Sequence, residues 1–173
     1  MTARLVTLTT AHAHQLEVFL ADFDRAPDEL HGYFCDRHWP IEQVVSALDD
    51  QSAGRDLPAG WVPCTTLFWE TETGFAGVLN IRHHLTPALR KTGGHIGYSI
   101  APSYRGRRLA RPMLAAGLAA CRALGIERAM LTCNASNEPS WRTIESNGGI
   151  LETEAWDEAN QRYQRTYWID LSD

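Results

Sequence analysis

The sequence lacks several features that mark common classes of protein. It has four cysteines that form no CxxC pair, Cys35, Cys64, Cys121 and Cys133. This spacing excludes the usual zinc and dithiol redox sites and favours free thiols in a reducing compartment. No apolar run approaches the ~20 residues of a membrane span, and polar residues follow Met1 too early for a secretory signal. We therefore expect a cytoplasmic protein with no membrane partner.

An excess of positive charge is missing as well. Lysine and arginine number 16 against 21 aspartate and glutamate residues, which gives a formal net charge of -5. Proteins that bind nucleic acids or anionic membranes usually carry a dominant basic face, so we expect neither partner. Internal repeats and low-complexity tracts are also absent. A length of 173 residues with 44% hydrophobic side chains predicts one globular domain over residues 1–173.

The most informative segment is residues 96–110, where a β-type run stops at Pro102 and a turn containing Gly106 opens a long helix. The turn carries three arginines, Arg105, Arg107 and Arg108. N–H groups at a helix start, the positive end of the helix dipole and guanidinium groups together favour an anionic ligand. We therefore predict a phosphorylated cofactor here, against the alternative of a solvated arginine cluster with only a structural role.

Hydrophobic periodicity predicts seven strands and four helices around this turn. The strands are expected at residues 5–8, 64–70, 75–82, 95–100, 126–133, 150–156 and 163–171. The helices are expected near residues 16–23, 41–48, 109–124 and 137–147, with loops at 24–40, 52–63 and 83–94. The strand at 95–100, the long helix and the strand at 126–133 predict a βαβ unit with parallel strands. Pro112 is expected to remove a hydrogen bond from the long helix and to bend it.

The order of these elements and the basic turn resemble the GNAT superfamily of N-acyltransferases, most sharply over residues 95–149. The acetyl-CoA site of that family has the pattern Arg/Gln-x-x-Gly-x-Gly/Ala, which maps onto Arg105, Arg108 and Ala110. Arg108 stands where the family usually has glycine, so we expect its backbone to keep right-handed or extended angles. The resemblance implies an α/β (α+β) single domain with a mixed, mostly antiparallel seven-stranded sheet flanked by about four helices.

The resemblance also implies acetyl-CoA as the donor substrate, with its pantetheine inserted between the fourth and fifth strands. The expected phosphate contacts are Arg105, Gly106, Arg107, Arg108, Leu109 and Ala110. The expected pantetheine contacts are Ser99, Ile100, Ala101 and Asn137. A main-chain N–H near Ile100 would polarise the thioester. No metal site is expected, because the adjacent His83 and His84 would point to opposite faces of a strand.

The chain lacks the catalytic tyrosine that is frequent in the resembled family. By alignment on Gly148, that position holds Ile144. We take Tyr163 as a candidate acid, with Tyr167 as a second phenol nearby, although packing is the commoner role of a strand tyrosine. His95 is the candidate base, because an imidazole pKa of ~6.5 suits proton removal near neutrality. A structural hydrogen bond is the alternative role for His95.

These observations predict transfer of an acetyl group from acetyl-CoA to a primary amine of a small molecule or peptide. The missing tyrosine favours the alternative of a catalytically idle acyl-CoA-binding or sensor module, and a nucleotide-binding interaction module is a further alternative for the basic turn. The loops at residues 24–40 and 52–63 are expected to line the acceptor pocket, where acidic residues favour a cationic amine. A homodimer formed by late-strand pairing is a candidate assembly.

Overall fold

The computed structural model describes residues 3–172, which form seven strands and five α-helices. The strands are β1 (Arg4–Val6), β2 (Cys64–Thr71), β3 (Gly74–Arg82), β4 (Ile96–Ile100), β5 (Arg128–Asn134), β6 (Ile150–Asp157) and β7 (Arg162–Asp170). The α-helices are α1 (Ala13–Ala21), α2 (Ile41–Ala53), α3 (Pro87–Lys91), α4 (Ala110–Ala123) and α5 (Glu138–Glu145). The short 3-10 helices are η1 (Thr10–His12), η2 (Pro27–Glu29) and η3 (Pro102–Tyr104). The predicted seven-stranded α/β domain is confirmed.

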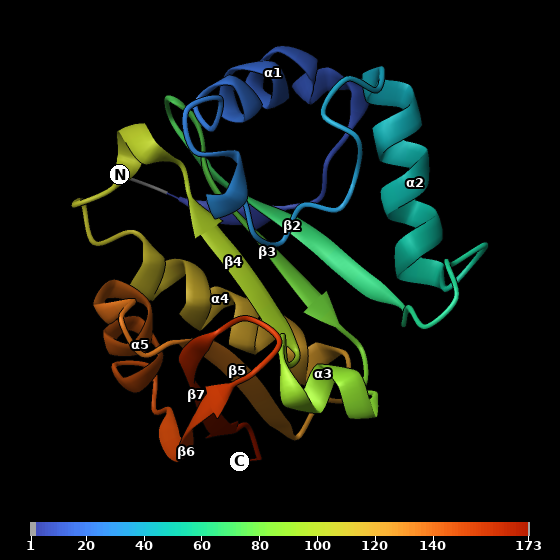
Figure 1. The fold of residues 1–173 in the computed structure, drawn as a ribbon. Helices are drawn as coiled ribbons and strands as arrows, with labels where there is room; N and C mark the ends of the chain where they lie inside the picture. The colour runs from blue at the N-terminus through green and yellow to red at the C-terminus, as the bar shows by residue number, and fades with distance from the viewer. Residues whose placement is uncertain (1–2, 173) are drawn as a thin grey trace.

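The seven strands divide into two antiparallel sheets (Figure 1). One sheet has the order β1-β2-β3-β4 and the other has the order β5-β7-β6. The prediction of a βαβ unit with parallel strands is therefore wrong, because β4 and β5 share no ladder and the isolated bridge just before β4, between Gly94 and Leu131, is antiparallel. Each strand has an antiparallel neighbour instead, since β4 pairs with β3 and β5 pairs with β7 over its whole length.

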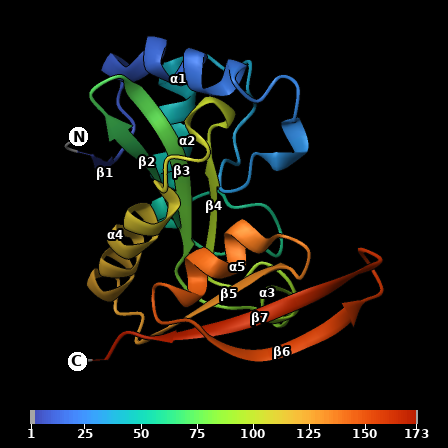
Figure 2. The same cartoon turned by 90° about the vertical axis from the view of Figure 1, so that its left-hand side faces the viewer.

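Two apolar cores lie on opposite faces of the four-stranded sheet. Successive side chains of a strand point to opposite faces, and Val78 and Leu79 of β3 accordingly belong to different cores. Val78 packs in the core beneath α1 and α2, with Phe19 and Phe68. Leu79 packs in the core around α4, which also takes in Tyr167 of β7. Figure 2 shows the two sheets one above the other, and this second core is what joins them.

Three local predictions are settled by the structure. The segment predicted as a loop at residues 83–94 contains α3, which is capped by Thr86 through an N–H···O bond from Leu89 (3.2 Å). Pro112 is the third residue of α4, where an N–H has no partner within the helix, so the expected loss of a hydrogen bond does not occur. The four cysteines are free thiols, as their spacing predicts.

The two sheets are tied together at the start of β4. The His95 N–H donates to the carbonyl oxygen of Met130 (2.7 Å), and the Met130 N–H donates back to Nδ1 of His95 (2.9 Å). On its other side, the His95 carbonyl accepts the Arg82 N–H of β3 (2.8 Å). Gly94, with a φ of 62°, lies so close to β5 that a Cβ there would collide with the Met130 carbonyl. This junction is therefore a backbone contact that only a glycine at position 94 permits.

We predict that Gly94→Ala lowers the free energy of unfolding by more than about 3 kcal/mol, because left-handed backbone strain adds to a backbone collision. Gly125→Ala is the matched control, since Gly125 also has a positive φ (78°) but has open space where the Cβ would lie. It should lose only about 1 kcal/mol. Urea unfolding of both variants measures the difference, and equal losses would show that the junction is not a close contact.

Candidate active site

Beyond the junction at His95, β4 and β5 form no ladder, and we call this unpaired stretch between the two strands the opening. Farther along β4, the Ala101 N–H donates to β3 (3.0 Å). In an antiparallel ladder, every second residue of a strand directs its main-chain N–H and C=O groups to the same neighbouring strand. The main-chain groups of Gly97, Ser99 and Ala101 therefore engage β3, and those of Tyr98 and Ile100 point away from it, along the free edge of β4.

The predicted pantetheine contacts thus differ in what their main chain can offer. Ile100 has its backbone on the free edge, and Ser99 and Ala101 have theirs against β3. The Ser99 hydroxyl is also engaged, because it donates to the Glu29 carbonyl and accepts the His31 N–H (both 2.7 Å). Sequence reasoning missed Tyr98 as an edge residue, and the two-residue alternation from Ile100 was the signal that identifies it.

The segment between β4 and α4 has the form that the sequence predicts for an anion site. After η3, Gly106 takes a positive φ (75°), and α4 begins at Ala110 with Leu109 as its N-cap. Within residues 3–172, none of the N–H groups of residues 106–111 has a protein acceptor. A row of free N–H groups at the positive end of a helix favours a bound anion. We call residues 105–110 the phosphate loop.

Arg108 corrects one expectation about this loop. Its φ is 59°, so it takes the left-handed conformation and not the right-handed or extended one predicted from its Cβ. An L-residue loses about 1 to 2 kcal/mol in that region compared with its usual angles. Arg108 therefore adopts the conformation in which the family's glycine would be unstrained. Its guanidinium has no hydrogen-bond or ion-pair partner in the part of the chain that the structure describes.

The other two arginines of the phosphate loop are already held by the protein. Arg105 donates from Nε to the Ile100 carbonyl (3.2 Å) and pairs through Nη1 with Glu29 (2.5 Å). Arg107 donates to the Ser103 carbonyl (3.0 Å) and lies over the Tyr104 ring, 5.1 Å from its centroid. Arg105 thereby connects the phosphate loop with both the free edge of β4 and η2.

A phenol from β4 reaches across the opening to α5. The Tyr98 hydroxyl lies 3.2 Å from Oγ of Ser140, and burial raises the pKa of Tyr98 to about 12. The Ser140 N–H donates to Oδ1 of Asn137 (3.2 Å), so Asn137 is the N-cap of α5, as the sequence predicts. Ile144, at the position of the usual tyrosine, is buried in the core around α4. Tyr98 therefore holds a protonated hydroxyl at neutral pH, next to α5.

The tyrosines near the end of the chain lie in different surroundings. Tyr163 is 56% exposed at the start of β7, with its ring 5.3 Å from that of Trp156. Tyr167 is fully buried and donates to Oε1 of Glu145 (2.9 Å). Burial, together with the Glu145 carboxylate, raises the pKa of Tyr167 to about 12. The structure gives the Tyr163 hydroxyl no hydrogen-bond partner within residues 3–172, so its role as an acid stays a prediction.

His95 is buried, and its imidazole is part of the junction between the sheets. Burial, with help from the charges of Arg90 and Arg82, lowers the pKa of His95 to about 4, so the ring is neutral at neutral pH. Because Nδ1 accepts the Met130 N–H (2.9 Å), the ring proton is on Nε2 and no lone pair remains free. The ring must give up this hydrogen bond to accept a proton from an amine. The role of His95 as a base stays a prediction.

The segment between α1 and α2 covers the same face of β4 that carries Ser99. Besides the two bonds to Ser99, Gly32 packs directly on Gly97. The acidic residues expected to favour a cationic amine are partly engaged, because Asp24 pairs with Arg37 (2.6 Å) and Glu29 pairs with Arg105. The segment therefore lies where an acceptor wall was predicted, but these two carboxylates are already neutralised.

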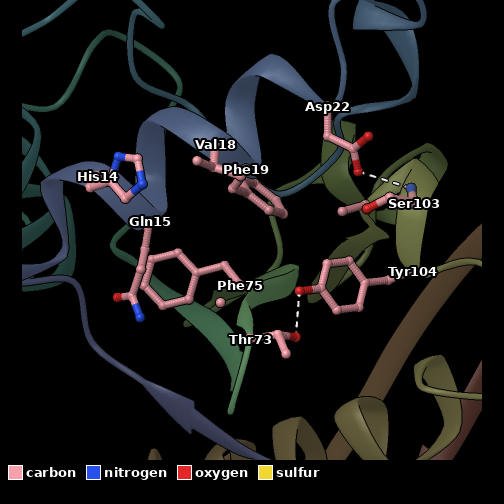
Figure 3. A pocket seen from close by; sticks show the side chains of 11 residues that line it. His14, Gln15, Val18, Phe19, Asp22, Thr73, Phe75, Ser103 and Tyr104 are labelled. Atoms are coloured by element: carbon pink, nitrogen blue, oxygen red, sulfur yellow. Dashed lines mark hydrogen bonds between the residues drawn. The ribbon is translucent and has the colours of Figure 1, made fainter.

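A hollow of about 250 Å³ lies on the other side of η3, beneath α1 (Figure 3). Asp22 of the segment after α1 accepts the Ser103 N–H (2.9 Å), and the Tyr104 hydroxyl lies 2.8 Å from Oγ1 of Thr73. Sequence reasoning missed this hollow, since its walls come from α1, the β2–β3 turn and η3. It borders the helix that leads into the phosphate loop.

Within residues 3–172, no group of three or more His, Cys, Asp and Glu side chains is arranged to hold a metal ion. In the same part of the chain, no helix has the length and apolar character needed to cross a membrane.

Comparisons with known proteins place this geometry in a family. A family model described as an acetyltransferase (GNAT) domain matches residues 4–150. Comparison with curated protein sequences gives no match. Among solved structures, the chain is similar to RimL, a ribosomal L7/L12 alpha-N-protein acetyltransferase in complex with coenzyme A. The identity is 16%, the TM-score is 0.71, and the match covers 98% of this chain and 94% of that one.

Two further solved structures are similar over nearly the whole chain. Mycobacterium smegmatis RimJ in complex with a coenzyme A disulfide has 22% identity and a TM-score of 0.69, with 97% of this chain and 81% of that chain covered. MccE, the microcin C7 self-immunity acetyltransferase in complex with acetyl-CoA and AMP, has 17% identity and a TM-score of 0.65, with coverage of 97% and 92%. At these identities the likeness concerns the fold.

The family match extends from β1 through the phosphate loop and α5. It confirms the resemblance, the enzyme class and the donor that were predicted from residues 95–149. The chain therefore belongs to the GNAT family of acetyl-CoA-dependent acetyltransferases.

Proposed function

We propose that this protein transfers the acetyl group of acetyl-CoA to a primary amine of a small molecule or peptide. The observation that carries the proposal is the row of free N–H groups at residues 106–111, at the end of a strand whose other edge is open. Diphosphate requires convergent donors, and pantetheine requires a strand edge for its amides. Both requirements are met within one continuous segment of the chain.

In this function the phosphate loop binds the diphosphate through its main-chain N–H groups and the guanidinium groups of Arg105, Arg107 and Arg108. The pantetheine amides then bond to the free edge of β4, at the main-chain groups of Tyr98 and the N–H of Ile100, whose carbonyl accepts Nε of Arg105. An N–H on this edge donates to the thioester oxygen and stabilises the negative charge that develops there when the amine attacks. Holding both reactants in line supplies up to about 7 to 11 kcal/mol of the barrier reduction.

Two protons move in the reaction. The attacking amine nitrogen forms a bond to the acetyl carbon, the C–S bond breaks, and the departing thiolate takes a proton. We assign the second proton to the Tyr98 hydroxyl, because it is protonated at neutral pH and belongs to the strand that the pantetheine follows. The amine proton goes to solvent or to a base, for which His95 is the residue predicted from the sequence.

One of the structural neighbours supports an amine acceptor on a protein. RimL is named as a ribosomal L7/L12 alpha-N-protein acetyltransferase, and MccE, a self-immunity acetyltransferase, was solved with acetyl-CoA and AMP. Ile144, buried where the family usually has its acid, favours the second candidate function, an idle acyl-CoA-binding or sensor module. The cytoplasmic location and the homodimer stay predictions. For the homodimer, β6 offers an edge strand with Ile150, Leu151 and Trp156 exposed.

We predict that Arg105→Gln weakens acetyl-CoA binding about tenfold, the size expected for the loss of a charge-assisted hydrogen bond. Glu29→Gln should strengthen binding, since it releases Arg105 from its ion pair. Arg55→Gln is the control, because Arg55 forms an ion pair of the same kind with Asp50 (2.7 Å) outside the site. Calorimetric titration with acetyl-CoA measures all three, and an unchanged Kd for Arg105→Gln would contradict the donor site.

We predict that His95→Gln distinguishes the structural role of His95 at the junction between the sheets from its role as the candidate base. Burial places the pKa of the folded state at about 4, below the unfolded value of ~6.5. The unfolded chain therefore binds the proton first, and the unfolding free energy falls as the pH drops from 6.5 to 4. Glutamine does not titrate, so the variant should lose this dependence in urea unfolding.

The same variant tests the base. Loss of a base lowers kcat by about 10- to 10³-fold at pH 7, with acetyl-CoA affinity unchanged. If kcat in the folded variant matches that of the wild type, His95 serves only as the junction between the sheets.

We predict that Tyr98→Phe lowers kcat by about 10²-fold at pH 7, because the ring remains while the proton donor is lost. Tyr163→Phe is measured beside it, as a test of the candidate drawn from the sequence. Coenzyme A affinity and thermal unfolding serve as controls for both variants. A large effect in Tyr163→Phe with none in Tyr98→Phe would assign the acid to β7.

A further inference from the structure

Arg82, the last residue of β3, carries a partly buried charge that the protein does not fully partner. Its Nη1 donates to the carbonyl oxygens of Gly93 (3.2 Å) and Gly94 (3.1 Å). Its Nε and Nη2 have no acceptor among residues 3–172, and none of the ion pairs in that range includes Arg82. Arginine remains charged in proteins. One edge of this guanidinium, the edge formed by Nε and Nη2, is therefore free.

The free edge is unusual among the partly buried arginines of this chain. Arg37 and Arg165 each reach a carboxylate, those of Asp24 and Glu154. A guanidinium withdrawn from water without a carboxylate loses solvation that two carbonyl bonds only partly replace. Two residues earlier on the same face, Asn80 has a buried Oδ1 that accepts no hydrogen bond in the part of the chain described. At this end of the sheet face, residues 3–172 therefore leave one guanidinium edge and one amide oxygen without a hydrogen-bond partner.

Aromatic side chains from two loops lie beside Arg82. Its guanidinium carbon lies 5.5 Å from the centroid of the Phe34 ring, and Phe34 packs edge to face with Trp61 at 5.6 Å. Phe34 comes from the segment before α2 and Trp61 from the segment before β2, the two loops predicted to line the pocket. Both rings are exposed, by 36% and 42%.

Gly97 brings the backbone of β4 close to the guanidinium. A Cβ at Gly97 would lie 3.7 Å from Nη2 of Arg82, in ordinary contact, and 3.8 Å from the main-chain nitrogen of Gly32. Gly97 shares its face of β4 with Ser99, next to the strand edge assigned to pantetheine. A group that reaches Arg82 therefore lies beside the acyl end of the donor in the proposed function.

The local charge favours an anion. His95 has its pKa lowered by burial and then by Arg90, Arg82 and His84, which are all cationic when protonated. Nearby, the charge of Glu29 acts to raise the pKa of His31, but the Glu29 carboxylate is already paired with Arg105. A ligand carboxylate at Arg82 would thus enter a positive field with no competing carboxylate on the guanidinium.

We propose that Arg82 determines acceptor specificity by binding a carboxylate of the amine substrate through its free Nε and Nη2 edge. These two N–H groups are parallel and match the two oxygens of a carboxylate in a bidentate pair. The inference rests on the proposed function and narrows its substrate class to amines that also carry a carboxylate, such as acidic peptides or amino acids. It replaces the cationic acceptor that the acidic loop residues favoured.

The test uses acceptors that differ in one group. The first pair is alanyl-glutamate and alanyl-glutamine, both as C-terminal amides, which differ only in the side-chain carboxylate. The second pair is alanyl-glycine and alanyl-glycinamide, which differ in the C-terminal carboxylate and are compared at equal ionisation of the amine. The rate of thiol release is measured with saturating acetyl-CoA. In at least one pair, the peptide with the carboxylate should have a kcat/KM about tenfold or more higher than its neutral partner. Calorimetry with the same peptides on the coenzyme A-saturated protein reads the preference without turnover.

Variants then assign the preference to Arg82. Arg82→Gln should abolish it through a higher KM with kcat little changed, and Arg82→Lys should retain only part of it because lysine lacks the parallel pair of donors. Arg90→Gln removes a nearby exposed charge and should preserve the preference. If Arg82→Gln does not fold, Arg82→Lys and the wild-type peptide pairs still decide the question.

The outcomes separate the two proposals. Turnover of neutral and carboxylate acceptors at equal efficiency, or a preference that survives in Arg82→Gln, overturns the role of Arg82 and leaves the acetyltransferase function intact. Carboxylate-dependent binding in calorimetry with no thiol release from any amine supports the Arg82 site and overturns the transfer function.

Discussion

Backbone N–H and C=O groups at a strand edge need partners, and β4 obtains them from β3 on one side only. On the other side, Gly94 and His95 meet β5 at Met130, and beyond that junction Tyr98 and Ile100 have no strand partner, although the Ile100 carbonyl accepts Nε of Arg105. The opening exists because β5 satisfies its own ladder with β7. An amide-bearing ligand can complete β4 as an added strand, so the site depends on two strands that meet at a point and then separate.

Charge is distributed along this opening at both ends of β4. Arg105 follows the carboxyl end of the strand, where the phosphate loop gathers free N–H groups at the start of α4. Arg82 lies beside Gly97 toward the other end, between aromatic side chains of two loops. In the proposed reaction the donor enters from the first end and the acceptor from the second, so their anionic groups are held apart while the reacting atoms meet between them.

Much of the fold was predictable because it rests on local signals. The hairpin of β2 and β3, the apolar stripe of α4 and the Asn137 cap of α5 each follow from a few neighbouring residues. The expectations that failed concern relations across the chain. The left-handed Arg108 reflects how the loop must close between β4 and α4, and the division into two sheets reflects which partner β5 finds among strands distant in sequence.

The sequence by itself predicted the phosphate loop, because a Gly-containing basic turn before a helix is a local arrangement whose chemistry follows from adjacent residues. Its resemblance to the GNAT superfamily, in the order of elements together with this turn, predicted the family and the donor. Only the tertiary structure decided which main-chain groups of β4 are free, that Nδ1 of His95 is engaged by Met130, and that Arg82 has one unpartnered edge. Each of these depends on a partner more than ten residues away. Hydrogen bonding and burial between such segments are properties of the folded chain, and no local pattern specifies them.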